Sequence, residues 1–413
     1  MSKLAMIPQY LPEEIFLQIF RNLPVKSLGK CMCVSKAWNC LIKNPSFIST
    51  HLNNQLEKSS RNNSDNLFLV MSSDPGNELK MRYFLQFDDQ EFSKYTQLQH
   101  DPFTDKHYVV GCCNGLLCFV DFKLGFIGNF MICNPIIRKC VRLPQPQPCF
   151  NGLPHNFTFG FGFDSRSNDY KLLKITKKDR LADVQLYSLK KKSWEILDPP
   201  KYDFYSNDFM VFVNGVVHFL VVQRVNDHGR SRCKLLVLGF DMADEVFKEI
   251  MLPESLSNAV KRPPSRLYVL SHGESLSIAV TEFCERGNCS IWIMKKYSVV
   301  ETWTKMLSFE KIENRCFPRI LGFRKNGGLL LKTSEVSQQL EISDEIENLE
   351  IHGRFSYIFS YVESLVLLDQ VIDARSENSA KNVSKASDSI KGATNDCTRS
   401  AAGDEATDHS SGH

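Results

Sequence analysis

The chain has 413 residues, of which 43% are hydrophobic and 23% are charged, and its formal net charge is +3 at pH 7. This length accommodates one large domain together with one or two small modules. The near-balanced charge is not that of a nucleic-acid-binding surface, and no apolar run approaches the ~18 residues of a membrane span. We therefore expect neither nucleic acid nor a membrane as a partner.

The compartment is inferred from the N-terminus and the cysteines. Glu13, Glu14 and Gln18 interrupt the apolar stretch that a signal peptide would need. The 14 cysteines include no CxxC pair, and several lie in apolar runs, where a thiol behaves as a small hydrophobic group. We expect free thiols and a reducing compartment, which is the cytoplasm, the nucleus or both.

Residues 6–50 are predicted to form a small all-α module of three helices. The first helix begins near Pro12 and ends at Pro24, a second covers residues 25–31, and a third runs from residue 34 until Pro45. The first helix has a broad apolar arc, made of Ile15, Phe16, Ile19, Phe20 and Leu23.

So small a module cannot enclose this apolar arc by itself, because units of about 40 residues are marginal even when well packed. Two interpretations stay open from the pattern alone. The helices can pack on the following domain as ordinary core, or part of the arc can bind a separate protein.

The rest of the chain divides into three segments. Residues 51–66 are polar and rich in Asn and Ser, which predicts a linker. Residues 67–372 contain short apolar or alternating runs typical of strands, and related phrases recur roughly every 45 to 55 residues. This spacing predicts a large all-β domain with a β-propeller-like repeat fold of about five or six blades. Residues 373–413 have almost no large apolar side chains, which predicts a disordered tail.

No catalytic or metal-binding motif stands out. The histidines are scattered, and Cys112–Cys113 and Cys284–Cys289 are better interpreted as strand or turn thiols than as ligand pairs. The chain has no GxSxG, HExxH or P-loop motif. The basic runs at 177–180 and 190–192 are predicted to be solvated hairpin tips. We expect no cofactor, no metal and no catalytic residue, although a propeller can carry an enzymatic site that a sequence does not display.

Two stretches resemble known families. LPEEIFLQIFRNLPVKSLGKCMCVSKAWNCLIKNPSF resembles the F-box pattern LPxEIxxxIxxxLPxKSLxxxxxVxKxWxxLIxxPxF. The phrases NGLLCF, NPIIRKCVRLP, GFGFDSRSNDYKLLKI, VQLYSLKKKSW and NGVVHF are similar to the plant F-box-associated, kelch-like domain. This group includes the S-locus F-box proteins, which recognise style ribonucleases in self-incompatibility.

The resemblance implies a substrate receptor of an SCF-type ubiquitin ligase. Its F-box would bind a Skp1-like adaptor, the adaptor would connect it to a cullin, and the β domain would hold a protein substrate. The docking residues implied by the motif are Leu11, Pro12, Ile15, Ile19, Leu23, Pro24, Leu28, Val34 and Trp38. Some of these must hold the helices together instead, and Trp38 is the first candidate for that role.

The substrate site is expected on loops at one rim of the β domain. The candidate loops are Gln145–Asn156, Tyr202–Asp208, Val225–Arg232 and Glu285–Asn288. Two alternatives to the SCF receptor are a propeller enzyme with an accessory helical module and an adaptor-bound scaffold that works without cullin.

Overall fold

The computed structural model describes most of the chain up to Asp369. The described residues are 12–61, 67–74, 77–89, 94–98, 107–123, 126–148, 156–178, 181–204, 210–227, 230–260, 265–282, 288–310, 319–324, 327–332, 336–340, 346–352 and 356–369. The predicted disordered tail, residues 373–413, lies outside them.

Four helices open the described chain, namely α1 (Glu13–Asn22), α2 (Val25–Met32), α3 (Lys36–Ile42) and α4 (Pro45–Arg61). Pro12 and Pro24 immediately precede α1 and α2, where a missing N–H costs no helical hydrogen bond. Ser35 caps α3, because its Oγ accepts a hydrogen bond of 3.1 Å from the backbone N–H of Trp38.

The fourth helix corrects the predicted linker. Residues 51–61 continue α4 instead of forming an irregular connector, so the module has four helices and not three. Its buried residues are Phe47, Ile48, His51 and Leu52, which recur with helical spacing. His51 is fully buried, and its Nε2 has a polar partner there, the carbonyl oxygen of Leu23 at 2.9 Å. The average polarity of this segment hid the apolar stripe that makes it a helix.

The β domain consists, among the described residues, of six antiparallel sheets, which are the blades of a propeller. Blade 1 contains β25 (Ser356–Tyr361), β1 (Leu67–Asp74), β2 (Asn77–Phe87) and β3 (Tyr95–Gln97). Blade 2 contains β4 (His107–Cys113), β5 (Leu116–Lys123), β6 (Phe126–Asn134) and β7 (Lys139–Arg142). Blade 3 contains β8 (Asn156–Asp164), β9 (Asp169–Lys178), β10 (Leu181–Ser188) and β11 (Ser193–Leu197).

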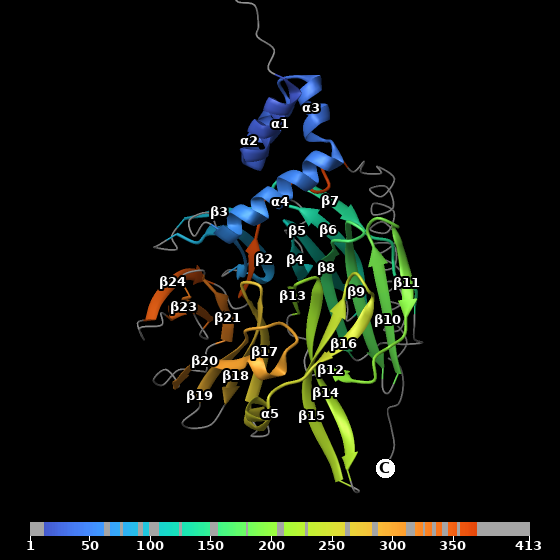
Figure 1. Ribbon diagram of the computed structural model, residues 1–413, viewed down its shortest axis with the longest axis vertical. Helices are drawn as coiled ribbons and strands as arrows, with labels where there is room; N and C mark the ends of the chain where they lie inside the picture. Colours follow the sequence, from blue (N-terminus) through green and yellow to red (C-terminus); the bar gives the residue numbers. More distant parts are fainter. Residues whose placement is uncertain are drawn as a thin grey trace, which may run out of the picture. The chain divides into compact units, whose positions relative to one another are not determined.

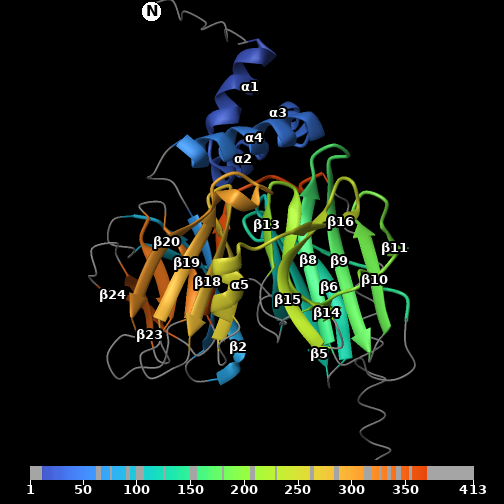
Figure 2. The same cartoon turned by 60° about the horizontal axis from the view of Figure 1, so that its bottom comes forward.

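The other three blades follow the same order. Blade 4 contains β12 (Asp203–Phe204) and β13 (Val211–Val213) on one edge, then β14 (Val216–Asp227), β15 (Arg230–Asp241) and β16 (Val246–Ile250). Blade 5 contains β17 (Ser265–His272), β18 (Ser275–Glu282), β19 (Asn288–Met294) and β20 (Trp303–Glu310). Blade 6 contains β21 (Arg319–Phe323), β22 (Leu329–Lys332), β23 (Val336–Leu340) and β24 (Ile346–His352). Two short helices lie between strands, α5 (Glu254–Val260) and η2 (Val300–Thr302). Figure 2 shows blades 3 and 5 as separate sheets on either side of the view.

The propeller is closed by its last strand. β25 pairs antiparallel with β1, with Leu67 opposite Tyr361 and Ser72 opposite Ser356. Strands from the two ends of the colour bar in Figure 1 therefore share one sheet. The predicted propeller of about five or six blades is confirmed. Blade 1 is complete only with β25, because it combines strands from the two ends of the domain.

The recurring phrases are structural parts of the blades. The four residues of the Asn-Gly pairs at 114–115 and 214–215 have positive φ, and the pairs form the turns that link β4 to β5 in blade 2 and β13 to β14 in blade 4. At Gly115 a Cβ would lie 2.4 Å from the carbonyl oxygen of Val362, so only glycine fits there.

Two other phrases each join neighbouring blades, and the first of them joins blade 3 to blade 4. Lys171, in the DYK phrase, is buried and its Nζ lies 2.9 Å from Asp164 Oδ2 and 2.7 Å from Glu245 Oε1. Despite the cost of burial, hydrogen bonds from Ser167 and Lys171 hold the pKa of Asp164 at about 2. This ion pair is therefore fully charged at neutral pH.

His218, in the NGVVHF phrase, joins blade 4 to blade 5. Its ring is fully buried, with Nδ1 3.1 Å from the carbonyl oxygen of Val211 and Nε2 2.7 Å from the Tyr297 hydroxyl. Burial lowers the pKa of His218 to about 4. The neutral ring donates from Nδ1 to the carbonyl and accepts from the tyrosine at Nε2.

One pair of cysteines departs from the expectation of free thiols. Cys133 on β6 and Cys140 on β7 form a disulfide. The two residues are directly opposite in the antiparallel register, and this pairing brings their side chains within bonding distance. Spacing along the chain did not show this, because the pairing depends on the register of the hairpin.

The buried histidine predicts a pH dependence of stability. His218 is neutral in the folded state down to about pH 4, whereas in the unfolded chain it ionises near 6.5. Its contribution is therefore complete above pH 6.5 and is lost as the pH falls toward 4, by about 2 kcal/mol between pH 7.5 and 5. Urea unfolding at the two pH values should show a smaller drop in the free energy of unfolding for His218→Gln than for the unchanged chain. Equal drops would contradict this assignment.

The buried lysine predicts a large effect of removing one charge. Lys171→Met leaves Asp164 buried without its cation, and we expect the free energy of unfolding to fall by about 3 kcal/mol or more. Lys248 is a matched control, because its Nζ also lies 2.9 Å from two carboxylates, of Asp241 and Asp244, but its side chain is 52% exposed. Lys248→Met should lower the free energy of unfolding far less in the same denaturation experiment, because solvent screens an exposed ion pair. Similar losses for both variants would show that burial does not set the strength of this ion pair.

Candidate functional site

The predicted docking residues of the F-box divide by exposure. Ile15, Ile19 and Val34 are 38%, 45% and 67% exposed although their side chains are apolar. Pro12 and Pro24 are also exposed, and Leu11 lies outside the described residues. These exposed positions are available to a partner.

The remaining predicted docking residues belong to the core of the helical module. Leu28 is fully enclosed and offers no surface to a partner, so its expected place in the interface is corrected. Trp38 is half-buried and its ring centroid lies 5.5 Å from that of Phe16 and 5.2 Å from that of Phe20. Leu23 is half-buried against the same cluster. Trp38 and Leu23 thus hold the helices together.

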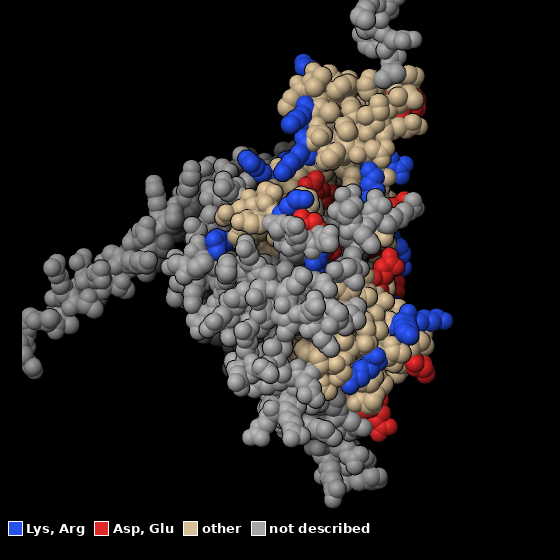
Figure 3. All heavy atoms as spheres, turned by 90° about the vertical axis from the view of Figure 1, so that its left-hand side faces the viewer, with Lys and Arg blue, Asp and Glu red and all other residues tan. Residues whose placement is uncertain are grey.

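The wide apolar arc of α1 therefore serves two surfaces. Phe16, Phe20 and Leu23 face the core, whereas Ile15 and Ile19, one turn apart, face outward. Figure 3 shows one side of the helical region, where uncharged residues predominate and basic side chains lie along one margin. The first of the two interpretations left open by the sequence, packing as core, holds for Phe16, Phe20 and Leu23, whereas binding of a separate protein by the exposed part of the arc stays a prediction.

A segment after β25 connects the F-box helices to the propeller; we call Val362–Leu368 the C-terminal strap. Leu365 of the strap is buried in the cluster that contains Phe20 and Leu28. Glu363 accepts a hydrogen bond from the backbone N–H of Val25, at the start of α2, and burial raises the pKa of its carboxyl group. The strap thereby completes the core of a module that is too small to close by itself.

The other side of the strap is held by the phrase NPIIRK of blade 2. Asn134 is fully buried and its Nδ2 donates to the carbonyl oxygens of Ser364 and Val366, at 2.8 and 2.9 Å. Lys139 donates from Nζ to the carbonyl oxygen of Leu368, at 2.9 Å. That Asn134 and Lys139 hold the strap was not predicted from the sequence, although their place in a recurring phrase was a signal.

The topology places the candidate substrate loops together. In each blade the strands alternate in direction. The turn between the innermost strand and the second strand therefore lies at one end of the propeller, and the turn between the second and third strands lies at the other end. The strap follows β25 at the end that carries Gly115, which we call the F-box end. The strands that flank all four candidate loops terminate at the opposite end, which we call the far end.

Parts of the four candidate loops, at 149–155, 205–209, 228–229 and 283–287, lie outside the described residues. The described strands on either side of these loops nevertheless show that the expected adaptor surface and the expected target surface lie at different ends of the propeller. Helices that can bind an adaptor contact the F-box end, and loops that can bind a target belong to the far end.

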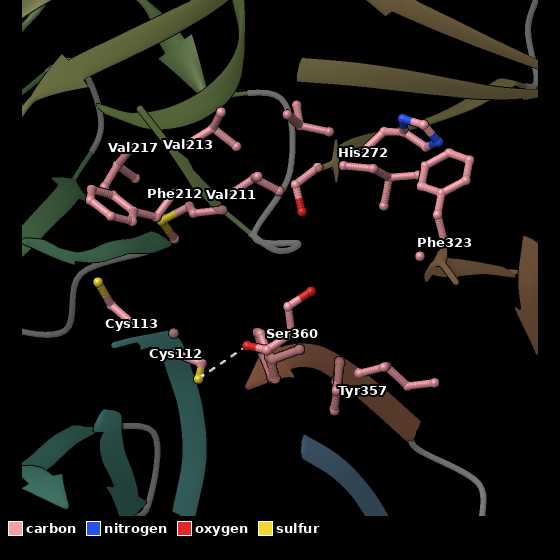
Figure 4. A pocket seen from close by; sticks show the side chains of 18 of the residues that line it. Cys112, Cys113, Val211, Phe212, Val213, Val217, His272, Phe323, Tyr357 and Ser360 are labelled. Atoms are coloured by element: carbon pink, nitrogen blue, oxygen red, sulfur yellow. Dashed lines mark hydrogen bonds between the residues drawn. The ribbon is translucent and has the colours of Figure 1, made fainter. Parts of the chain in front are cut away.

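A central cavity of about 1000 Å³ lies where the blades meet. Each blade contributes its innermost strand, and α4 contributes Leu56, Ser59 and Ser60. Figure 4 shows labelled side chains from β4, β13, β17, β21 and β25 around this space. The sequence could not indicate the cavity, because its lining comes from strands of all six blades and from α4.

Within the described part of the chain, no three His, Cys, Asp or Glu side chains gather closely enough to hold a metal ion. None of the described helices is both long enough and apolar enough to cross a membrane. The Cys118 thiol is fully buried, and burial raises its pKa well above the ordinary value, so it stays protonated at neutral pH.

Comparison with known proteins accounts for both parts of the chain. Residues 9–54 match the F-box-like family, and residues 78–368 match the F-box associated beta propeller domain family. The F-box protein At3g07870 of Arabidopsis thaliana is 27% identical over 78% of this chain and 82% of its own length. The Arabidopsis F-box/kelch-repeat protein At3g23880 is 24% identical over 73% of this chain and 80% of its own length.

Among solved structures, TolB from Acinetobacter baumannii covers 76% of this chain and 73% of its own, with a TM-score of 0.41 and 10% identity, too distant to bear on function. The family match spans well over half of the chain and coincides with the propeller seen in the structure. The protein therefore belongs to the F-box proteins that carry an F-box associated β-propeller domain.

Proposed function

We propose that this protein is the substrate-recognition subunit of an SCF-type ubiquitin ligase. The exposed face of the F-box, with Ile15, Ile19 and Val34, binds a Skp1-type adaptor that connects it to a cullin. The far end of the propeller binds a protein target. The chain contributes no catalytic group of its own, and it accelerates ubiquitin transfer by holding the target close to the charged enzyme.

The observation that carries this proposal is the exposure of large apolar side chains on an F-box whose core is otherwise complete. Leu28 and Ile42 are fully buried and Leu365 of the strap closes the cluster, so the helices do not need Ile15 or Ile19 for their own packing. Exposed apolar side chains of this kind are typical of a protein interface.

The partners and compartment follow from the same proposal. The adaptor and cullin act in the cytoplasm and nucleus, where we place this protein. The resemblance to S-locus F-box proteins makes a style ribonuclease the first target to test. Of the alternatives, an enzyme would contain a bound cofactor or metal after purification, and a scaffold would bind the adaptor without promoting ubiquitin transfer.

Two substitutions on the exposed face of α1 test adaptor binding. Ile15→Asp combined with Ile19→Asp removes two partly exposed apolar groups and should weaken binding to a Skp1-type adaptor by about tenfold to a hundredfold. Isothermal titration calorimetry or surface plasmon resonance measures this effect. Leu23 is avoided, because a charge in the core would unfold the module.

Ile196→Asp provides the matched control, since Ile196 is 63% exposed on β11 of the propeller. It should leave adaptor binding unchanged. If the double variant binds as tightly as the control while melting at the same temperature, the exposed face of α1 is not the adaptor interface.

The separation of the two ends predicts that target binding survives the loss of adaptor binding. In cells with the proteasome blocked, Ile15→Asp combined with Ile19→Asp should still co-purify with the target but without adaptor and cullin. Quantitative mass spectrometry of the captured proteins checks this. Loss of the target together with the adaptor would contradict the assignment of separate surfaces at the two ends. In a reconstituted assay, the same variant should leave the target unmodified, which distinguishes a ligase subunit from a scaffold.

A further inference from the structure

We propose that the central cavity of the propeller is a binding site for one uncharged, mainly apolar small molecule. The proposal goes beyond adaptor docking and does not depend on it. It rests on the size of the cavity and the chemistry of its walls.

The size of the cavity is that of a ligand site. Its volume of about 1000 Å³ is at the upper end of the range of roughly 300–1000 Å³ typical of small-molecule sites. A single side chain from a protein target would fill only a small part of this space.

The walls of the cavity are more apolar than polar. Four blades contribute apolar side chains to the lining, namely Val110, Val211, Phe212, Val269, Leu321 and Phe323. Water next to such a surface is unfavourable, and a molecule with apolar groups gains free energy by displacing it.

A few polar groups are placed where they can orient a ligand. The side chain of Ser360 points into the open centre in Figure 4, and its backbone carbonyl accepts a hydrogen bond from Cys112 Sγ at 3.6 Å. His272 of blade 5 packs edge-on against Phe323 of blade 6, with ring centroids 4.8 Å apart. A hydroxyl and an imidazole within one lining suit a molecule with one or two hydrogen-bonding groups.

The charges around the cavity favour an uncharged ligand. Arg324 lines it at the F-box end, but its Nε is 2.6 Å from Asp88 Oδ1, so this cation is already neutralised. Glu274 lies at the same end and is exposed. Burial lowers the pKa of His272, so the imidazole is neutral at pH 7. No charged side chain of the described lining is therefore available in the interior to pair with an ionic ligand.

Helix α4 borders the cavity at its F-box end. Leu56, Ser59 and Ser60, from the last two turns of this helix, form part of the lining. A bound molecule would thus contact the helix that leads from the F-box into the propeller. The ligand would enter from the far end.

Nile red, an uncharged fluorescent dye, is a suitable probe for the full chain. We expect saturable binding of one molecule per chain, measured by fluorescence titration and resolved as a single adduct by native mass spectrometry. Binding without saturation, several weak adducts, or no adduct in the unchanged protein would overturn the proposal and indicate a cavity filled with water only.

Substitutions that fill the cavity locate the site. Ser360→Trp and, from a different blade, Val211→Trp should each weaken dye binding by about tenfold or more, because the indole occupies the ligand's volume. Ile196→Trp adds the same ring on the outside of the propeller. It should bind the dye as the unchanged chain does.

Each variant is first checked for a cooperative thermal transition, and if one filling variant does not fold, the other decides. Equal affinity of a folded filling variant and of Ile196→Trp overturns the proposal. Failure of this test leaves adaptor binding untouched, because Ile15 and Ile19 are outside the cavity.

Discussion

The pairing of β25 with β1 is the constraint on which the rest of the structure depends. It closes the propeller with the last strand of the domain, and it sends the chain directly into the strap at the F-box end. Leu365 then completes the helical core, while Asn134 and Lys139 hold the strap from the other side. The F-box is therefore not an independent domain on a flexible connector. Its core is completed by residues more than 300 positions later in the chain, so closure of the propeller and stability of the F-box are linked.

This arrangement has a functional consequence. A ligase receptor must hold its target at a limited distance and direction from the adaptor, because its contribution to rate is positioning. A connector of irregular chain would permit many orientations. A continuous helix α4 together with a hydrogen-bonded strap reduces that freedom. The resulting geometry directs the adaptor surface and the candidate target surface toward opposite ends of the propeller.

Much of the fold could be predicted, because strand periodicity and recurring phrases are local. The helical module, the propeller and its approximate number of blades could be predicted. The recurring phrases form turns and contacts between blades, such as those of Lys171 and His218. The errors concern contacts between distant segments. The motif could not distinguish buried Leu28 from exposed Ile19, since both are apolar residues at family positions. Helix α4, the Cys133–Cys140 disulfide and the central cavity likewise depend on burial and register that only the folded chain defines.

The central claim is that one side of α1 belongs to the core of this protein and the other side to its partner. Hydroxyl-radical footprinting of the full chain, with and without a Skp1-type adaptor, tests it most directly because the method reports the exposure of individual side chains. The account predicts that labelling of Ile15, Ile19 and Val34 falls when the adaptor is added, while labelling of exposed Ile196 on the propeller stays the same. Unchanged labelling of the three F-box residues in a saturated complex would contradict it.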